Sequence, residues 1–498
     1  MTALSPEPLI VSLVQMATTF PMFLLAIPAG ALTDIVNRRH FLIAVEIVGT
    51  ALAALFAIIV WLNLVTPLVL LLFTFLISAS SVLAAPAWQA IVPSLVPKAA
   101  LPPAITANSV GFNIARAIGP ALGGGIIGLL GIAAPFWINA VSNLAVVGSL
   151  LWLRLSTKNE SDLPAEHFWG ATIAGIRYCR HNAPLIATMI RGGSFFLFAV
   201  AYWALLPLVV RQQIEGGAGL YGTILGTIGG GAVAGAFLLP SIKRLLGPDR
   251  VIVLGTLGTT LALVLFGMAR ETPIAYAASG IAGASWIIVL AGLNVSAQVA
   301  LPDWVRGRGL AVYLTATFGA MTLGSVIWGK SAELIGLPST FFAATAGLLA
   351  AIPLTWRWKL QAGAALDLAP SLYWPPPATA WDVAHDRGPI LVTVEYKITP
   401  QDKAAFLIAL ADLKRARLRD GAYSWEIFED AARPGQFLET FHVASWIEHL
   451  RQHERTTMAD QPKQLAVAGF QRKGQPIVSH FIAARPGKPP LSGRLSVE

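Results

Sequence analysis

The stretch Gly30-Ala-Leu-Thr-Asp-Ile-Val-Asn-Arg-Arg-His40 is a short polar segment between two long apolar runs. The run before it, Leu9–Leu32, carries no charged residue, and the run after it, Phe41–Leu62, carries only Glu46. Each run has the roughly 20 apolar residues that an α-helix needs to cross a bilayer. We therefore expect a hairpin of two membrane-spanning helices joined by the polar segment.

The residues inside this polar segment suggest how the hairpin is held. Arg38 and Arg39 place it on the cytoplasmic side, because short cytoplasmic loops concentrate Lys and Arg. Asp34 ends the first helix, where a carboxylate is costly unless a cation one turn away, such as Arg38, compensates it. Gly30 permits close packing of a neighbouring helix, and Asn37 tolerates a left-handed backbone where the chain reverses.

The composition indicates many membrane spans. Of 498 residues, 55% are apolar and only 12% are charged, which is too apolar for a soluble protein of this size. The net charge of +9 is best explained by cytoplasmic loops that face anionic lipid, so membrane lipid is an expected partner and nucleic acid is not. The single cysteine, Cys179, excludes an internal disulfide and a cysteine-rich metal site.

Apolar runs long enough to span a membrane occur throughout the first 356 residues. There are eleven: Leu9–Leu32, Phe41–Leu62, Leu68–Ile91, Ile105–Leu130, Ile132–Leu153, Leu185–Val210, Leu220–Ile242, Val251–Ala269, Ile274–Ala300, Gly309–Gly329 and Thr340–Trp356. Basic residues concentrate on alternate connections, which places those connections and everything after Trp356 in the cytoplasm.

The second half of the apolar region echoes the first. Gly235-Ala-Phe, followed by Lys243 and Arg244, repeats the pattern of Gly30-Ala-Leu with Arg38 and Arg39. When the halves are aligned on these glycines, the run Leu185–Val210 has no counterpart before Leu9. We expect that one helix is missing at the N-terminus.

After Trp356 the pattern changes to that of an α+β domain. Alternating apolar residues predict strands, and longer amphipathic stretches predict helices. The expected order is a strand at Ile390–Ile398, a helix at Gln401–Arg419, strands at Tyr423–Glu429 and Gln436–Ala444, a helix at Trp446–Ala459 and a strand at Ile477–Ala483. This order is the ferredoxin-like one.

The chain therefore divides into six segments. We expect an N-terminal membrane bundle over 1–155, a cytoplasmic linker with an amphipathic surface helix over 156–184, a C-terminal membrane bundle over 185–358, a proline-rich linker over 359–388, a cytoplasmic ferredoxin-like domain over 389–486 and a tail over 487–498.

A glycine-rich stretch lies inside the predicted span Ile105–Leu130. Gly119, Gly123 and Gly124 recur at helical-turn spacing, which allows close helix packing, and Pro120 bends the helix. A small-residue packing face with no further role is one interpretation of these residues.

Several polar residues lie in otherwise apolar spans. Arg116 is a candidate site for an anionic substrate, although a structural pair with Glu46 or Asp34 explains it equally well. Arg191 lies near a span end and is expected to extend toward water. The remaining candidates for the lining of a substrate cavity are Asn108, Asn113, Asn139, Asn143, Asn294 and Gln298.

Two of these motifs resemble signatures of the major facilitator superfamily. Residues 30–39 resemble Gly-x-Leu-x-Asp-x-x-Gly-Arg-Arg, with Asn37 in place of a Gly, and residues 119–124 resemble the Gly-Pro-x-x-Gly-Gly core of its exporters. The branch that looks nearest contains exporters related to the enterobactin exporter, often called transmembrane secretion effectors. The resemblance implies twelve helices in two bundles and export of a siderophore-like or drug-like molecule across the plasma membrane by alternating access, usually powered by protons. Glu46 is the candidate coupling residue, and no cofactor is expected.

The C-terminal domain resembles the antibiotic-biosynthesis-monooxygenase-like dimeric barrels, which implies a homodimer. A membrane-tethered enzyme or sensor that acts on or binds a small aromatic ligand is the alternative function. Four histidines occur there, His442, His449, His453 and His480, and two of them are one helical turn apart. Charged neighbours favour a solvated helix face, so no metal is expected.

Overall fold

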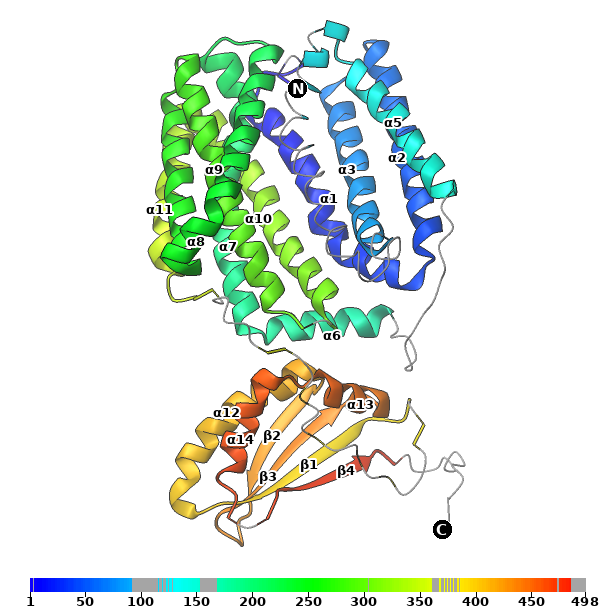
Figure 1. Ribbon diagram of the computed structural model, residues 1–498, viewed down its shortest axis with the longest axis vertical. Coiled ribbons are helices and arrows are strands. Elements are labelled where there is room, and N and C mark those ends of the chain that lie inside the picture. The colour runs from blue at the N-terminus through cyan, green and yellow to red at the C-terminus, as the bar shows by residue number, and fades with distance from the viewer. Residues whose placement is uncertain are drawn as a thin grey trace. The chain divides into compact units, whose positions relative to one another are not determined.

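The computed structural model describes most of the chain and forms two compact units. It describes residues 1–2, 4–91, 129–152, 168–302, 304–360, 386–472 and 474–484, with isolated positions between 115 and 127 and between 367 and 384. The helical unit comprises Met1–Phe168, Ala187–Gln298 and Leu310–Ala362, and the α/β unit comprises Trp169–Ile186, Val299–Gly309 and Gly363–Glu498 (Figure 1).

The helical unit consists of long apolar helices. Within the described ranges, nine helices are long and apolar enough to cross a membrane. They are α1 (Pro8–Ile35), α2 (Arg38–Trp61), α3 (Pro67–Ile91), α5 (Ala134–Trp152), α7 (Ala183–Leu208), α8 (Ala218–Met268), α9 (Thr272–Val299), α10 (Arg306–Ile335) and α11 (Leu337–Thr355). A mainly helical membrane protein is thereby confirmed.

The number of spans differs from the expected eleven for two reasons. Helix α8 has 51 residues and contains two predicted runs, which meet at Gly247, where the backbone has φ +72° and leaves the helical conformation. The predicted run Ile105–Leu130 falls mostly on residues outside the described ranges. Glycine permits the positive φ that separates the two parts of α8.

Helices α8 and α9 pack at close backbone distance through glycine. The backbone oxygen of Ala284 occupies the space that a Cβ at Gly235 would need, and that of Ile228 does the same for Gly283. No described atom lies within 4 Å of a Cβ built at Gly30. The echo position Gly235 shows the close approach, and for Gly30 the close approach stays a prediction.

The α/β unit contains a four-stranded antiparallel sheet. The strands are β1 (Ile390–Lys397), β2 (Ser424–Glu429), β3 (Gln436–Val443) and β4 (Ile477–Ile482), and the helices are α6 (Phe168–Arg180), α12 (Lys403–Asp420), α13 (Trp446–Arg455) and α14 (Gln461–Ala468). The spatial strand order is β2-β3-β1-β4. The four predicted strands and the two predicted helices occur in the expected order, and an additional helix, α14, precedes β4.

One face of this sheet carries the core of the unit. Val392 and Val394 alternate with residues on the opposite face, and their side chains are buried with Phe406 of α12, Trp446 of α13 and Val467 of α14. The three helices therefore cover the same face. The other face of the sheet has none of these core residues.

The predicted helix Trp446–Ala459 is too long. Helix α13 ends at Arg455, and a capping box between Thr457 and Asp460 starts a new turn that leads into α14. Pro462 stands in the first turn of α14, where proline is well tolerated. Helix α14 was not among the helices expected from the sequence.

Arg191 is buried inside the helical unit, and the expectation that it extends toward water is wrong. Its guanidinium pairs with the carboxylate of Asp249, next to the break in α8. The same carboxylate accepts a hydrogen bond of 3.1 Å from the backbone N–H of Leu360, which follows α11. This ion pair therefore joins three segments that are far apart in the sequence.

Removing the acid should destabilise the protein more than removing the base. Arg191 is 4% exposed and Asp249 is 24% exposed, so Asp249→Asn leaves a buried charge without compensation, a loss of about 3–5 kcal/mol. Arg191→Gln leaves a carboxylate that water reaches. The thermal midpoint of the purified protein in detergent should fall further for Asp249→Asn.

The exposed pair Lys330 and Glu333 on α10 provides the control. Lys330→Gln should change the midpoint little, because exposed ion pairs contribute about 0–1 kcal/mol. Equal midpoints for Asp249→Asn and Arg191→Gln would contradict the role of Arg191 as the buried member.

Candidate functional site

The two halves of the helical unit meet where α1 crosses α10. The hydroxyl groups of Thr19 and Thr322 are 2.9 Å apart and buried. The ring of Phe23 fills the space beside Gly319. Because Gly319 and Thr322 lie one turn apart, this contact occupies one face of α10.

A different face of α10 packs on α7 (Figure 1). The indole of Trp328 donates a hydrogen bond of 2.7 Å to the backbone oxygen of Leu197. The same backbone oxygen and the side chain of Val200 lie against Gly324. Helix α10 therefore touches a helix of each half.

The polar loop between α1 and α2 is built around two side chains. Asn37 caps α2, because its side-chain oxygen accepts hydrogen bonds from the backbone N–H groups of Arg39 (3.1 Å) and His40 (3.2 Å). The φ of Asn37 is −62°, so the left-handed conformation expected for it is wrong. An extended backbone with a side-chain acceptor is the usual geometry of a helix N-cap.

Arg39 joins the polar loop to the end of α5. Its guanidinium donates hydrogen bonds to the backbone oxygens of Leu150 (2.8 Å) and Leu151 (2.7 Å). The last carbonyls of a helix lack partners within the helix and carry partial negative charge. Arg39 therefore caps the C-terminus of α5 across more than a hundred residues of sequence.

The expected pair of Asp34 and Arg38 stays a prediction. Helix α1 ends at Ile35 and α2 begins at Arg38, so both residues lie at helix ends. Their side chains are outside the part that the structure describes.

Most of the glycine-rich motif and its neighbours also lie outside the described ranges. Gly119 and Gly123 are helical, and no described atom lies within 4 Å of a Cβ at either position. The other candidate residues of this segment lie outside the described ranges: Asn108, Asn113, Arg116, Pro120 and Gly124.

The other four cavity candidates lie on α5 and α9, and the candidate coupling residue Glu46 lies on α2. Asn139 is exposed and Asn143 half-buried on α5, Asn294 is half-buried and Gln298 exposed on α9, and Glu46 is half-buried on α2. Side chains with this exposure in apolar helices face lipid, a neighbouring helix or a cavity. Their assignment to a cavity stays a prediction.

The α/β unit contains a junction that the sequence analysis missed. Tyr178 of α6 and Trp304, just before α10, meet edge to face with ring centroids 5.4 Å apart. Arg419 of α12 lies over the Tyr178 ring at 5.3 Å, and Arg455 of α13 lies over the Trp304 ring at 4.5 Å. Such cation–π contacts contribute about 0.5–2 kcal/mol each.

Two carboxylates hold Arg419 in this junction. Its guanidinium donates to Asp420 at 2.7 and 2.9 Å and to Asp460 at 2.6 and 3.3 Å. Burial acts to raise the pKa of Asp460, but Arg419 and Lys463 outweigh it and hold that pKa below its usual range. Burial raises the pKa of Asp420 despite the same arginine. Asp460 is thus the carboxylate that the cations stabilise in its charged form.

Tyr178 lies within the segment 156–184, for which an amphipathic helix at the membrane surface is expected from the sequence. The predicted helix is present as α6, but Tyr178 is buried inside the α/β unit. The exposed apolar residues of α6 are Ile173 and Ile176, one turn apart. The local sequence around Tyr178 carries no information about a partner more than a hundred residues away, so the junction had no local signal.

Replacing Arg39 should destabilise the end of α5. Arg39→Gln removes both hydrogen bonds, a loss of about 2–3 kcal/mol for two charge-assisted bonds, whereas Arg39→Lys can keep one. The thermal midpoint in detergent should be highest for the wild type, lower for Arg39→Lys and lowest for Arg39→Gln. Arg244→Gln, at an exposed position of α8, is the control; a Gln variant as stable as this control would refute the capping role.

Comparison with known proteins identifies related transporters. The chain is 24% identical to the multidrug efflux pump Tap of Mycolicibacterium fortuitum over 359 residues, which cover 68% of this chain and 84% of the pump. It is 23% identical to the staphyloferrin A transporter of Staphylococcus aureus over 340 residues, 66% of this chain and 82% of that protein. These relatives are named as a pump and a transporter, not as enzymes.

The fold is also similar to solved transporter structures. A bacterial homologue of the human lysosomal transporter Spinster, solved in an inward-facing and unoccupied conformation, matches with a TM-score of 0.53 at 14% identity, over 70% of this chain and 95% of that one. The nucleoside transporter NupG matches with a TM-score of 0.52 at 12% identity, over 71% and 90%.

The profile of the family described as transmembrane secretion effector matches residues 1–487. This match spans both the helical unit and the α/β sheet. The chain therefore belongs to the transmembrane secretion effectors, a family of multi-pass major facilitator transporters.

Proposed function

We propose that the protein exports a small siderophore-like or drug-like molecule across the plasma membrane by alternating access. The names of the relatives, a multidrug efflux pump and a siderophore transporter, support this substrate range. The observation that carries the proposal is the contact between α1 and α10, because alternating access requires the two halves to separate and rejoin.

The chemistry of that contact suits reversible separation. Thr19 and Thr322 share one neutral hydrogen bond, which contributes only about 0.5–1.5 kcal/mol. Glycine at position 319 adds close packing without a charge that would have to be desolvated again on closing. The described residues that make this contact, Thr19, Phe23, Gly319 and Thr322, are all uncharged.

The sequence motifs supply the remaining parts of the proposed cycle. Asp34 and Arg38 form the gate at the cytoplasmic loop, and Gly30 belongs to the same motif. Glu46, a half-buried carboxylate on a membrane helix, carries the coupling proton. Asn139 and Asn294 are two of the polar residues that line the substrate cavity in this proposal.

A panel of dyes and siderophores tests export. Cells that express the protein should accumulate less of at least one compound than cells that lack it, and a protonophore should abolish the difference. Asp34→Asn should reach the membrane but lose export. Equal accumulation with and without the protein across the panel would contradict the proposal, and export by Asp34→Asn at the wild-type rate would remove Asp34 from the gate.

A reversible cross-link tests alternating access directly. The double variant Thr19→Cys with Thr322→Cys, in a Cys179→Ala background, places two thiols where the hydroxyl groups are 2.9 Å apart. Oxidation or a short bifunctional thiosulfonate should stop export, and reduction should restore it. The single variant Thr19→Cys is the control. Export that continues in the cross-linked protein would show that the contact does not open.

We further propose that the sheet lies in the cytoplasm, as a ferredoxin-like domain that pairs with a second copy. Its open face, opposite the core, carries Phe428 of β2 and Ile477 and Phe481 of β4, which are 49%, 55% and 55% exposed. Leu391 and Leu438 lie on the same face between them. An antiparallel sheet with one apolar open face gains stability when a second sheet covers it.

The mass of the full-length protein in detergent tests this pairing. The wild type should be a dimer, and Phe481→Glu with Phe428→Glu should be a monomer that still exports. Lys403→Glu, on the exposed surface of α12, is the control for added negative charge. A monomeric wild type would rule out the dimer and leave the export proposal standing.

A further inference from the structure

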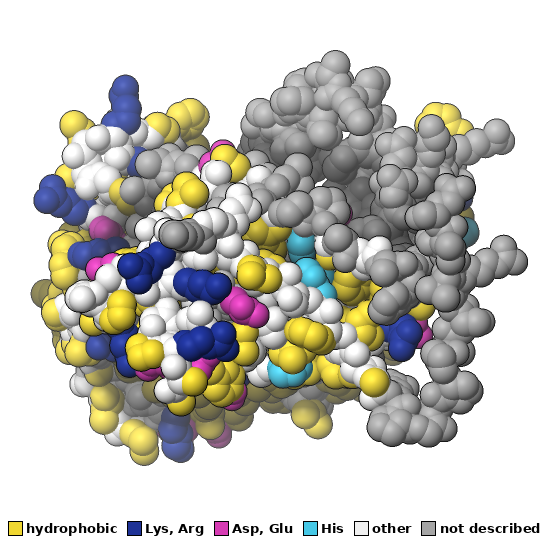
Figure 2. Space-filling view, turned by 90° about the horizontal axis from the view of Figure 1, so that it is seen from below, with side chains coloured by type: hydrophobic (Ala, Val, Ile, Leu, Met, Phe, Trp, Pro, Cys, Tyr) yellow, Lys and Arg dark blue, Asp and Glu magenta, His cyan; other side chains and the backbone are white. Residues whose placement is uncertain are grey.

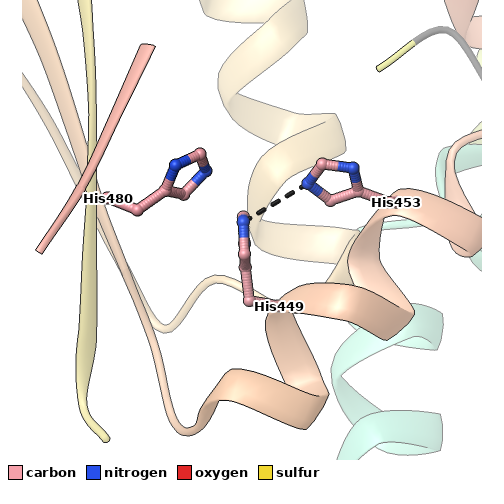
Figure 3. Close-up of side chains that lie close together, drawn as sticks. All are labelled: His449, His453 and His480. Atoms are coloured by element: carbon pink, nitrogen blue, oxygen red, sulfur yellow. Dashed lines mark hydrogen bonds between the residues drawn. The ribbon is translucent and has the colours of Figure 1, made fainter. Parts of the chain in front are cut away.

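Three histidines of the α/β unit face one another, and helix α13 and strand β4 supply them. His449 and His453 are one turn apart on α13, and His480 extends toward them from β4 (Figure 3). One ring nitrogen from each lies within 4.8 Å of the other two. His449 is 1% exposed, so the solvated helix face expected from the sequence is wrong for this residue.

We propose that His449, His453 and His480 bind a transition metal ion of the zinc class. The Nε2 atoms of His449 and His453 are 3.3 Å apart. Two nitrogens bound tetrahedrally at about 2.0–2.1 Å from zinc would also be separated by about 3.3 Å. Two histidines at i and i+4 on one helix face are a common arrangement for zinc ligands.

The three imidazoles lie in a partly dry environment. Burial and the neighbouring imidazoles act in the same direction and lower the pKa of His449 and of His453. Arg417 lies near both rings, but its charge is compensated by Glu439 at 3.2 Å.

The neighbouring side chains resemble the outer shell of a metal site. The Nδ1 atom of His449 is buried without a hydrogen-bond partner in the described residues, as are both polar atoms of the adjacent Gln452 side chain. Gln452 is close enough to act on the His449 ring, and an amide oxygen that accepts from Nδ1–H would leave Nε2 free for an ion. The rings of Trp446 and His449 are tilted against each other with centroids 5.6 Å apart, and the rings of Trp374 and His453 meet edge to face at 5.2 Å.

The ligand set determines which ions fit. Nitrogen ligands without a carboxylate suit Zn²⁺, Co²⁺, Ni²⁺ or Cu²⁺ and do not suit Mg²⁺ or Ca²⁺. Three protein ligands leave a fourth position for water or another ligand. An ion can enter from solvent, because His453 and His480 are only half-buried. Figure 2 shows histidine side chains at the surface of the molecule, without distinguishing which histidines they are.

Zinc binding to the full-length protein provides the test. The protein is purified in detergent through a tag without histidine, stripped with a chelator and titrated with Zn²⁺ against a chromophoric competitor. The wild type should bind one ion per chain and show a higher thermal midpoint with Zn²⁺. His453→Gln and His480→Gln should bind at least about 10-fold more weakly, since even changes to outer-shell residues cost 10–100-fold.

His442→Gln is the matched control. His442 lies in the same sheet, but its Nδ1 atom is 2.9 Å from the Ser424 hydroxyl and is not part of the cluster, so this variant should bind as the wild type does. Wild-type protein loaded with Co²⁺ should show the intense visible absorption of a tetrahedral site, a readout that does not depend on how the variants fold. Failure of the wild type to bind Zn²⁺ stoichiometrically, an octahedral Co²⁺ spectrum, or unchanged binding in folded His453→Gln and His480→Gln would overturn the proposal.

Discussion

A guanidinium group taken out of water has to meet oxygen atoms, and this requirement positions segments in both units. Arg191 meets Asp249 and thereby joins α7 to the break in α8. Arg39 meets the last carbonyls of α5, and Arg419 meets Asp420 and Asp460. Because desolvation offsets much of the attraction, such pairs specify the arrangement of segments more than they add to the net free energy of folding.

The contacts that must change during transport have a different character. Helix α10 meets α1, a helix of the other half, through two threonines, a phenylalanine ring and a glycine. Neutral contacts of this kind separate without exposing a buried charge to lipid. The ion pair of Arg191 and Asp249 lies within one half, where it holds α7 to α8. The neutral contact of Thr19 with Thr322 lies between the halves, where movement is proposed.

Helix α13 connects the two notable features of the α/β unit. It carries His449 and His453 of the proposed metal site, and two residues later it carries Arg455 over the ring of Trp304. Glu448 on the same helix accepts a hydrogen bond from Arg455 at 2.9 Å. Trp304 lies just before α10. One short helix, α13, therefore carries two histidines of the cluster and also contacts the segment that leads into α10.

Local patterns in the sequence determined the helices, the strands and their order. Apolar runs of membrane length predict α1, α2 and α3 because a lipid environment selects composition directly, and alternation predicts β1 because one side of the strand is buried. Such patterns report whether a side chain is shielded from water, and nothing about which distant residue shields it. Only the tertiary structure decided that Arg39 caps α5, that Tyr178 is buried beside Arg419 and that His480 meets a pair of histidines from α13. Each of these contacts joins residues that are far apart in the chain, and the chemistry of such a pair exists only once folding has brought them together.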